Sequence, residues 1–152
     1  MKKTWIWALA GLFAVASLAA PEGVAQDRPS SLVAISLLSG FQYPARDADI
    51  TGLRLNLLSG SHHDVTGLDL GLISNRASGD VAGLEIAIGF NSVGGDFRGV
   101  QVAAYNRVGG RARGVQLGLV NWSSHLTGVQ IGVLNFVEHA TMGFFPILHF
   151  AF

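Results

Sequence analysis

The sequence predicts an exported all-β protein built from tandem strand-and-turn units. Three observations carry this prediction: a glycine-headed phrase recurs from residue 52 to residue 135, apolar residues alternate with small or polar ones inside each phrase, and 20 of the 152 residues are glycine. Alternation with a period of two is typical of strands, and this much glycine suits turns and close strand packing rather than helices. The head glycines are Gly52, Gly67, Gly83, Gly99, Gly114 and Gly128.

The N-terminus has the composition of a secretory signal. Lys2 and Lys3 precede a short apolar stretch from Trp5 to Leu18, and small residues occupy positions 23 and 25. That pattern predicts a signal peptide over residues 1–25 and a single β-repeat domain over residues 26–152. An uncleaved N-terminal anchor is the alternative interpretation.

Composition excludes several classes of function. Both lysines lie in the predicted signal, so the remaining chain is nearly neutral and has no basic surface for nucleic acid. The chain has no cysteine, which excludes disulfides and cysteine-based metal sites. Beyond the signal, no apolar run is long enough for a membrane-spanning helix.

The first predicted strand covers Ser31 to Tyr43, with Val33, Ile35 and Leu37 on one face. A charged turn follows from Pro44 to Asp49. The last strand, Met142 to Phe152, again has apolar residues at alternate positions and ends on phenylalanine, as bacterial outer-membrane barrels do. With the six repeats between them, these segments predict eight strands.

Each repeat places Leu or Val directly after its glycine and a polar residue one position later. Most repeats close with Asn or Ser: Ser59, Asn75, Asn91, Asn106, Asn121 and Asn135. One face of each unit is therefore aliphatic, and the other carries glycine, a small residue and a polar stripe. The polar stripe consists of Arg54, Asp69, Glu85, Gln101, Gln116 and Gln130.

Two architectures fit this pattern, and the favoured one is an eight-stranded antiparallel up-and-down β-barrel of outer-membrane type. A hairpin turn at Gly109-Gly110 would pair Ala104 with Val115 and lay Tyr105 over Gly114, so that apolar faces coincide. The aliphatic face would then meet membrane lipid, and the polar stripe would fill the lumen.

The alternative is a parallel β-solenoid with one unit per coil, in which identical residues stack on one another. The inter-strand stretches look short and polar for a second side of a coil. In its favour, apolar pairs recur at matched places in those stretches: Ala77 and Val81, Val93 and Phe97, Val108 and Ala112.

The units GLDLGLIS, GVQLGLVN and GVQIGVLN resemble the bacterial surface-repeat proteins, which carry tandem GVQxGLxN units. The resemblance extends over about Ser31 to Phe152. It departs at Ala103-Ala104-Tyr105, and at His149, where such endings often carry Asn. The resemblance implies export and a location at the outer membrane or cell surface. It supplies no catalytic residues and no cofactor.

Few residues suggest chemistry. His62-His63-Asp64 is the one metal-like cluster, but adjacent histidines on a strand point apart, so we interpret it as a solvated loop tip and predict no metal site. In the barrel, His125 would share its rim and His139 would lie on the opposite rim. Asp69 and Glu85 resemble a carboxylate pair, yet they are better explained as partners that balance Arg54.

The sequence therefore predicts a non-enzymatic exported protein with a structural or surface-interaction role, with outer-membrane lipid as its partner and no cofactor. The alternative is a secreted or peripheral β-solenoid that binds a partner through its Gln and Asn stripe. An enzyme embedded in the membrane is the least favoured hypothesis, because no catalytic constellation accompanies the repeats.

Overall fold

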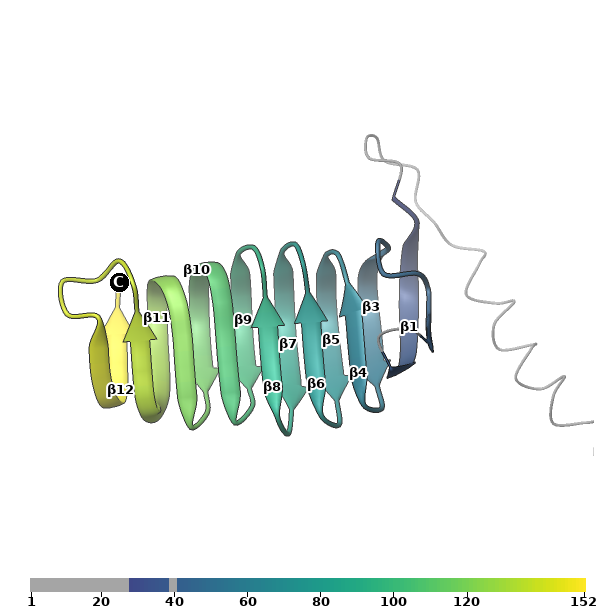
Figure 1. Ribbon diagram of the computed structural model, residues 1–152. Helices are drawn as coiled ribbons and strands as arrows, with labels where there is room; N and C mark the ends of the chain where they lie inside the picture. Colours follow the sequence, from purple (N-terminus) through teal and green to yellow (C-terminus); the bar gives the residue numbers. More distant parts are fainter. Residues whose placement is uncertain (1–27, 39–40) are drawn as a thin grey trace, which may run out of the picture.

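The computed structural model describes residues 28–38 and 41–152, and over them the chain forms a parallel β-solenoid of about 7 turns. The predicted signal peptide lies outside the described residues. Figure 1 shows the strands side by side along one axis. In chain order they are β1 (Ser30–Leu38), β2 (Phe41–Tyr43), β3 (Asp49–Asn56), β4 (Ser59–His62), β5 (Val65–Gly71), β6 (Ser74–Ala77), β7 (Val81–Ala87), β8 (Phe90–Val93), β9 (Phe97–Val102), β10 (Tyr105–Leu117), β11 (Val120–Val137) and β12 (Phe144–Ala151).

The all-β prediction is confirmed, but the favoured barrel is wrong and the alternative solenoid is right. The head glycines decide between them, since Gly67 pairs with Gly52 on one side and with Gly83 on the other in parallel register. The same register continues from Gly99 through Gly114 to Gly128. Tyr105 accordingly pairs with Phe90 and Val120 rather than lying over Gly114.

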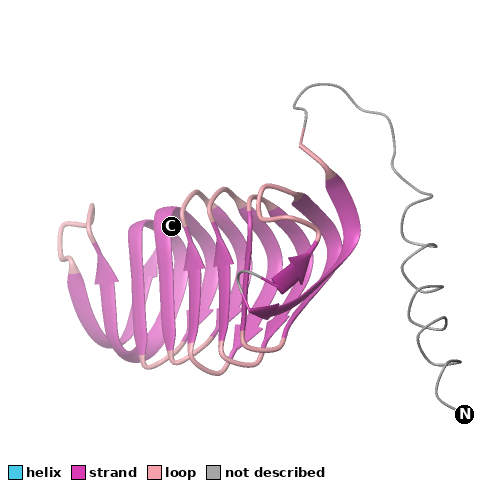
Figure 2. Cartoon of the chain, turned by 45° about the vertical axis from the view of Figure 1, so that its right-hand side comes forward, coloured by secondary structure: helices cyan, strands magenta, loops and turns pink. Residues whose placement is uncertain are grey.

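Each coil has a long side and a short side. The long sheet consists of β1, β3, β5, β7, β9 and the later parts of β10 and β11. The short sheet consists of β4, β6, β8 and the earlier parts of β10 and β11. Figure 2 shows the two sides joined by turns at the two edges of the molecule. The predicted turn at Gly109-Gly110 is instead a corner inside β10, where the chain passes from the short sheet to the long one.

The interior between the two sheets is narrow and mixed in character. Its apolar part consists of alanine, valine, isoleucine and leucine side chains and one aromatic, Phe97. The matched apolar pairs that favoured a solenoid are buried in it: Ala77, Val81, Val93, Phe97, Val108 and Ala112. The stretches judged too short and polar for a second side therefore supply much of the core.

Both ends of the solenoid carry antiparallel strands. The predicted first strand divides into β1 and β2, which pair antiparallel through Ile35 and Tyr43. At the other end β12 pairs antiparallel with β11, placing Phe150 opposite Val129 and Leu148 opposite Ile131. In the described part of the chain, no helix is long and apolar enough to cross a membrane.

Candidate functional site

The polar stripe predicted from the repeats lies inside the solenoid rather than on its surface. Its six residues come from β3, β5, β7, β9, β10 and β11, and none is more than 1% exposed. Gln101 Nε2 donates to Glu85 Oε2 at 2.6 Å, Gln116 Nε2 donates to Gln101 Oε1 at 2.9 Å, and Gln130 Nε2 donates to Gln116 Oε1 at 2.7 Å. The stripe is a chain of hydrogen bonds that joins successive coils, so no partner can reach it.

The N-terminal end of the stripe is charged. Arg54 donates through Nε to Asp69 Oδ1 at 2.8 Å and through Nη2 to Asp69 Oδ2, so its guanidinium is engaged with one carboxylate. Glu85 Oε1 stands 3.9 Å from Arg54 Nη2 and has no hydrogen-bond partner. Burial, together with the negative charge of Asp69, raises the pKa of Glu85 to about 8. Glu85 therefore holds its proton at neutral pH.

Asp69 and Glu85 lie side by side, as their shared place in neighbouring repeats predicts. Both are fully buried in the stripe and face hydrogen-bonding partners of neighbouring coils. Acid–base catalysis needs a substrate pocket next to the acid, and neither described pocket is lined by Asp69 or Glu85. The pair is a structural element that joins coils.

A second ladder, made of asparagines, runs beside the stripe. Asn91 Nδ2 donates to Asn106 Oδ1 at 3.0 Å and to the Val102 carbonyl at 3.2 Å, and the same arrangement recurs along the molecule. The asparagines at the ends of the repeats predict most of this ladder, but its first member is not Ser59. It is Asn56, which donates to Asn75 Oδ1 at 2.6 Å. The ladder consists of Asn56, Asn75, Asn91, Asn106, Asn121 and Asn135.

The histidine pair divides between the interior and the surface, as strand alternation predicts, so the interpretation of the cluster as a solvated loop tip is wrong for His62. His62 is fully buried, with Nδ1 3.4 Å from Arg54 Nη1, and burial together with the Arg54 charge lowers its pKa to about 4. His63 turns outward, and its Nδ1 lies 2.8 Å from Asp64 Oδ1 and 3.5 Å from Asp49 Oδ1. Ligand atoms of these three residues lie within 4.8 Å of one another. Arg28 Nη1 also lies 3.0 Å from His63 Nδ1, so a cation already occupies this side of the cluster.

His125 and His139 correct one further expectation. His125 and His139 do not lie on opposite rims, because a parallel solenoid brings every turn of one kind to the same edge. Their rings stack at 4.3 Å between centroids.

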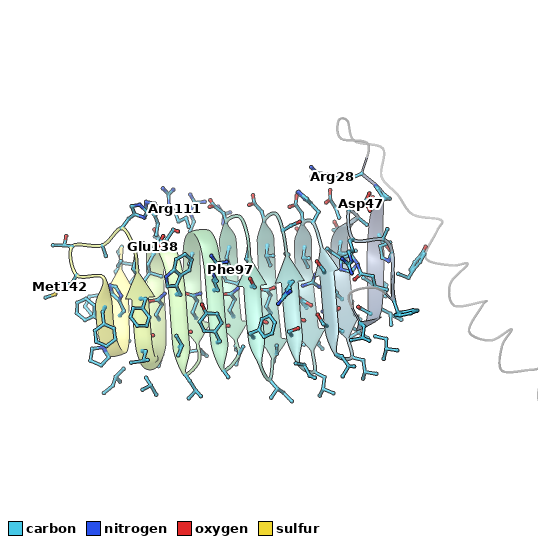
Figure 3. All side chains as sticks on the ribbon, in the orientation of Figure 1. Arg28, Asp47, Phe97, Arg111, Glu138 and Met142 are labelled. Carbon is cyan, nitrogen blue, oxygen red and sulfur yellow. The ribbon has the colours of Figure 1, made fainter. Side chains whose placement is uncertain are left out.

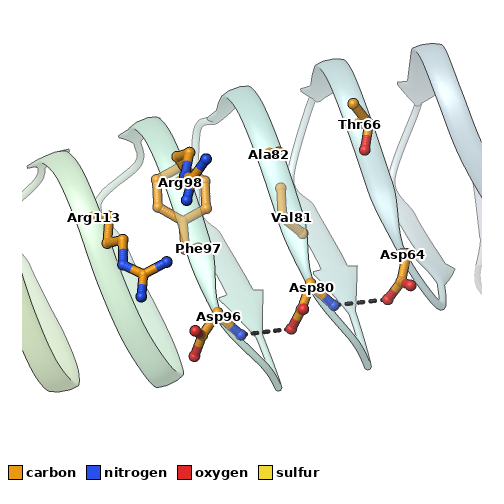
Figure 4. A pocket seen from close by; sticks show the side chains of 9 residues that line it. All are labelled: Asp64, Thr66, Asp80, Val81, Ala82, Asp96, Phe97, Arg98 and Arg113. Atoms are coloured by element: carbon orange, nitrogen blue, oxygen red, sulfur yellow. Dashed lines mark hydrogen bonds between the residues drawn. The ribbon is translucent and has the colours of Figure 1, made fainter.

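The edge where the short sheet returns to the long one carries a row of carboxylates. Asp64 Oδ1 accepts a hydrogen bond from the Asp80 backbone amide at 2.7 Å, and Asp80 Oδ1 accepts one from the Asp96 amide at 2.8 Å (Figure 4). Asp96 continues the series with the Arg111 amide at 2.8 Å. We call Asp49, Asp64, Asp80 and Asp96 the acidic edge. A pocket of about 270 Å³ beside it is lined by Asp64, Thr66, Asp80, Val81, Ala82, Asp96, Phe97, Arg98 and Arg113.

The outer surface of the long sheet is aliphatic. Positions one, three and five residues after each head glycine point outward, as Leu84, Ile86 and Ile88 do after Gly83. Val33, Ile35 and Leu37 extend the three rows onto β1, and Leu148 and Phe150 extend two of them onto β12. We call these rows the aliphatic face. Its chemistry is visible in the sequence as the aliphatic side of each repeat. The barrel interpretation places this side outward, whereas the solenoid interpretation exposes the Gln and Asn stripe for binding; the structure is a solenoid in which the stripe is buried and the aliphatic side is outward.

The chain matches no family model, and comparisons with curated proteins and with solved structures find no match. The resemblance to surface-repeat proteins therefore stays a prediction.

Proposed function

We propose that this protein is an exported, non-enzymatic β-solenoid that acts as a peripheral binding module at the cell surface and docks through its aliphatic face. The solenoid supports the alternative function predicted from the sequence, but with a different binding surface. The Gln and Asn residues that the sequence assigned to binding are buried and hydrogen-bonded to side chains of neighbouring coils.

The observation that carries the proposal is the size of the aliphatic face. Its rows cross eight strands, from β1 to β12, at about 4.8 Å per strand, and cover five residues of each repeat strand at about 3.3 Å per residue. That is roughly 440 Å² measured between backbone positions alone. The largest apolar patch on a soluble monomer is typically about 300–600 Å² and is often functional.

The distribution of polar groups supports a non-catalytic role. The buried acids and amides of the described residues are engaged in the ladders, and the carboxylates of the acidic edge accept backbone amides. Catalysis needs a nucleophile, a base and a space for the reacting atoms in one place. Most buried polar side chains of the described residues are instead hydrogen-bonded within the fold, with Glu85 Oε1 among the few buried atoms that lack a partner.

Cell-envelope fractionation of matched variants tests the proposal. Leu70→Glu with Ile86→Glu places two charges on the aliphatic face, and Thr66→Glu with Thr127→Glu places two at the end of the same sheet that precedes the head glycines. We expect the wild type and the Thr66/Thr127 variant to stay with the envelope. The Leu70/Ile86 variant should move to the soluble fraction while keeping its circular dichroism spectrum. Identical distribution of the two folded variants would refute docking through the aliphatic face.

A further inference from the structure

Exposure of the aliphatic face increases toward one edge of the solenoid. Leu84 and Ile86 are 37% and 39% exposed, whereas Ile88, the last outward residue of that strand, is 71% exposed. Leu119 occupies the same place two coils later and is 60% exposed. The turns beyond these positions are apolar as well. We call this edge the apolar corner, and it comprises Leu57, Leu58, Leu72, Ile73, Ile88, Leu119, Val133 and Leu134.

The apolar corner lies opposite the charged edge of the molecule. Figure 3 shows carbon side chains along the lower edge of the solenoid, while Arg111 and Glu138 lie at the upper edge. The acidic edge is part of that upper edge, because Asp96 caps the amide of Arg111. Each coil of the solenoid therefore has an apolar edge at one end of its cross-section and a charged edge at the other.

Many backbone amides of the apolar corner are paired within the protein. These turn amides donate to carbonyls of the preceding coil: Leu72 to Asn56 at 2.9 Å, Gly89 to Ile73 at 2.9 Å and Leu134 to Leu119 at 2.9 Å. Burying an unpaired backbone amide in hydrocarbon costs several kcal/mol, which normally keeps turns out of lipid. Because each coil pairs several amides of the next turn, the cost of bringing this edge against lipid is reduced.

Aromatic and arginine side chains follow the apolar corner on the short sheet. The Arg76 guanidinium lies 4.9 Å from the centroid of the Phe90 ring, and the Arg107 guanidinium lies 4.8 Å from the Trp122 ring. Arg107 is two residues along β10 from its first residue, Tyr105, or about 7 Å from the corner. Interfacial proteins bury their apolar side about 5–10 Å deep, and arginine and aromatic groups then lie at the level of the lipid headgroups.

We infer that the apolar corner and the adjoining aliphatic face dock on the surface of a lipid bilayer, with the acidic edge facing water. This inference rests on the proposed function and names the partner of the docking surface. Arg76 and Arg107 face the headgroups and favour anionic lipids, while the carboxylates are held at the far edge of the molecule.

A bilayer fits this surface better than a second copy of the chain does. Protein interfaces are enriched in aromatic residues and arginine and carry hydrogen bonds. The three rows of the aliphatic face on the repeat strands are Leu, Ile, Val and one Ala, without a hydrogen-bonding side chain. A second flat sheet would also cover the face while leaving the convex corner, its most exposed part, in water.

Co-sedimentation with vesicles tests the inference. The protein is purified from its native cells and mixed with vesicles of phosphatidylethanolamine and phosphatidylglycerol, or of phosphatidylcholine alone. Ile88→Glu with Leu119→Glu charges the corner, and Thr66→Glu with Thr127→Glu is the matched control at the far end of the same sheet. All variants share the same N-terminal segment, so differences between them report the corner.

We expect the wild type and the control to bind both kinds of vesicle, more tightly when phosphatidylglycerol is present. The corner variant should lose at least about tenfold in affinity, since two apolar side chains no longer enter the bilayer. Its melting temperature and light scattering verify that it remains folded and monomeric.

Two results would overturn the inference. The first is equal vesicle binding by the corner variant and its control. The second is a wild type that ignores vesicles but forms a dimer abolished by the corner substitutions, which would assign the surface to a second copy. The envelope test with the Leu70/Ile86 variant separates the two proposals: if that variant still leaves the envelope while the wild type ignores vesicles, the proposed function stands and the lipid partner does not.

Discussion

At the residue scale, the proton held by Glu85 makes stability depend on pH. The unfolded chain loses this proton near the ordinary value of 4.5, whereas the folded chain keeps it up to about 8. Between these values the unfolded state binds fewer protons, so the free energy of unfolding falls as pH rises. His62 has the opposite effect between about 4 and its ordinary value of 6.5. The effect of Glu85 is therefore cleanest between pH 6.5 and 8.

Glu85→Gln removes that titration and keeps an acceptor for Gln101. We expect the variant to be more stable than the wild type at pH 8, by more than about 1 kcal/mol, and the difference to vanish below pH 4.5. Urea unfolding at a series of pH values measures it. A constant difference across that range would contradict the assignment of a buried proton to Glu85.

Gly99 illustrates why a head glycine cannot be replaced. Its φ is 136°, a conformation that L side chains rarely adopt, and a Cβ there would overlap the Gly83 carbonyl of the preceding coil. We expect Gly99→Ala to destabilise the fold by at least about 3 kcal/mol, from backbone strain and the clash together. Gly143→Ala is the control, because its Cβ would lie 3.3 Å from the Val137 carbonyl, a neighbour that can shift by a few tenths of an ångström. Thermal unfolding of both variants checks the prediction, and equal melting temperatures would contradict it.

At the scale of the elements, the asparagine ladder stabilises the contact between coils. Asn106 accepts from Asn91 at 3.0 Å and donates to Asn121 Oδ1 at 2.9 Å and to the Leu117 carbonyl at 2.8 Å. Asn106→Ala leaves the buried Asn121 Oδ1 without its donor and removes one hydrogen bond each from Asn91 Nδ2 and the Leu117 carbonyl, and we expect a loss of about 2–3 kcal/mol. Ser92→Ala, on the outer side of the same sheet, should change stability by less than about 0.5 kcal/mol. Chemical denaturation measures the free energy of unfolding of both variants. A loss for Asn106→Ala as small as that for Ser92→Ala would contradict the prediction and would mean that water replaces the Asn106 side chain in the ladder.

The strands and their two faces can be predicted from the sequence, but the direction in which they pair cannot. Alternation with a period of two places Leu84 and Glu85 on opposite faces of their strand whether the neighbouring strand is parallel or antiparallel. Considered alone, Gly109-Gly110 favours a hairpin, because two glycines readily form a tight two-residue turn. Glycines at these positions are equally suited to close stacking of parallel coils, so the pair does not distinguish the two architectures. Gly109 in fact lies against the Gly94 carbonyl of the preceding coil.

The sequence feature that distinguishes the two architectures is the nearly constant spacing between identical residues in successive repeats. Gln101, Gln116 and Gln130 recur at nearly constant spacing, and only parallel stacking places each amide against the next. The apolar pairs in the short stretches, such as Val93 and Phe97, carry the same information, because a second buried side is needed only in a coil. The aliphatic face is outward in the barrel interpretation and in the structure, but the solenoid interpretation exposes the Gln and Asn stripe instead, so the sequence separates the two faces without telling which one points outward.

At the scale of the whole molecule, the ends determine whether the solenoid stays a single unit. A row of parallel coils exposes an unpaired strand at each end, and such edges recruit other chains. At one end β12 covers β11 in the antiparallel direction, with Pro146 opposite Leu134 and Ile147 at a φ of 69°. Proline lacks the amide that a further strand would need, so β12 is a poor template for growth.

Removal of β12 tests this role of the C-terminal strand. A chain that ends after residue 143 exposes the outer edge of β11 and the buried side of Gln130, which pairs with His149 in the intact protein. We expect this shortened chain to form oligomers or filaments that grow with protein concentration, because the free edge matches the parallel coils of another copy. Light scattering and size-exclusion chromatography measure this assembly. Deletion of Phe152 alone, a residue that is 96% exposed, serves as the control and should leave the oligomeric state of the full chain unchanged. Oligomers that form equally in the presence of the Ile88/Leu119 substitutions would assign assembly to the strand edge, whereas their loss would assign it to the apolar corner.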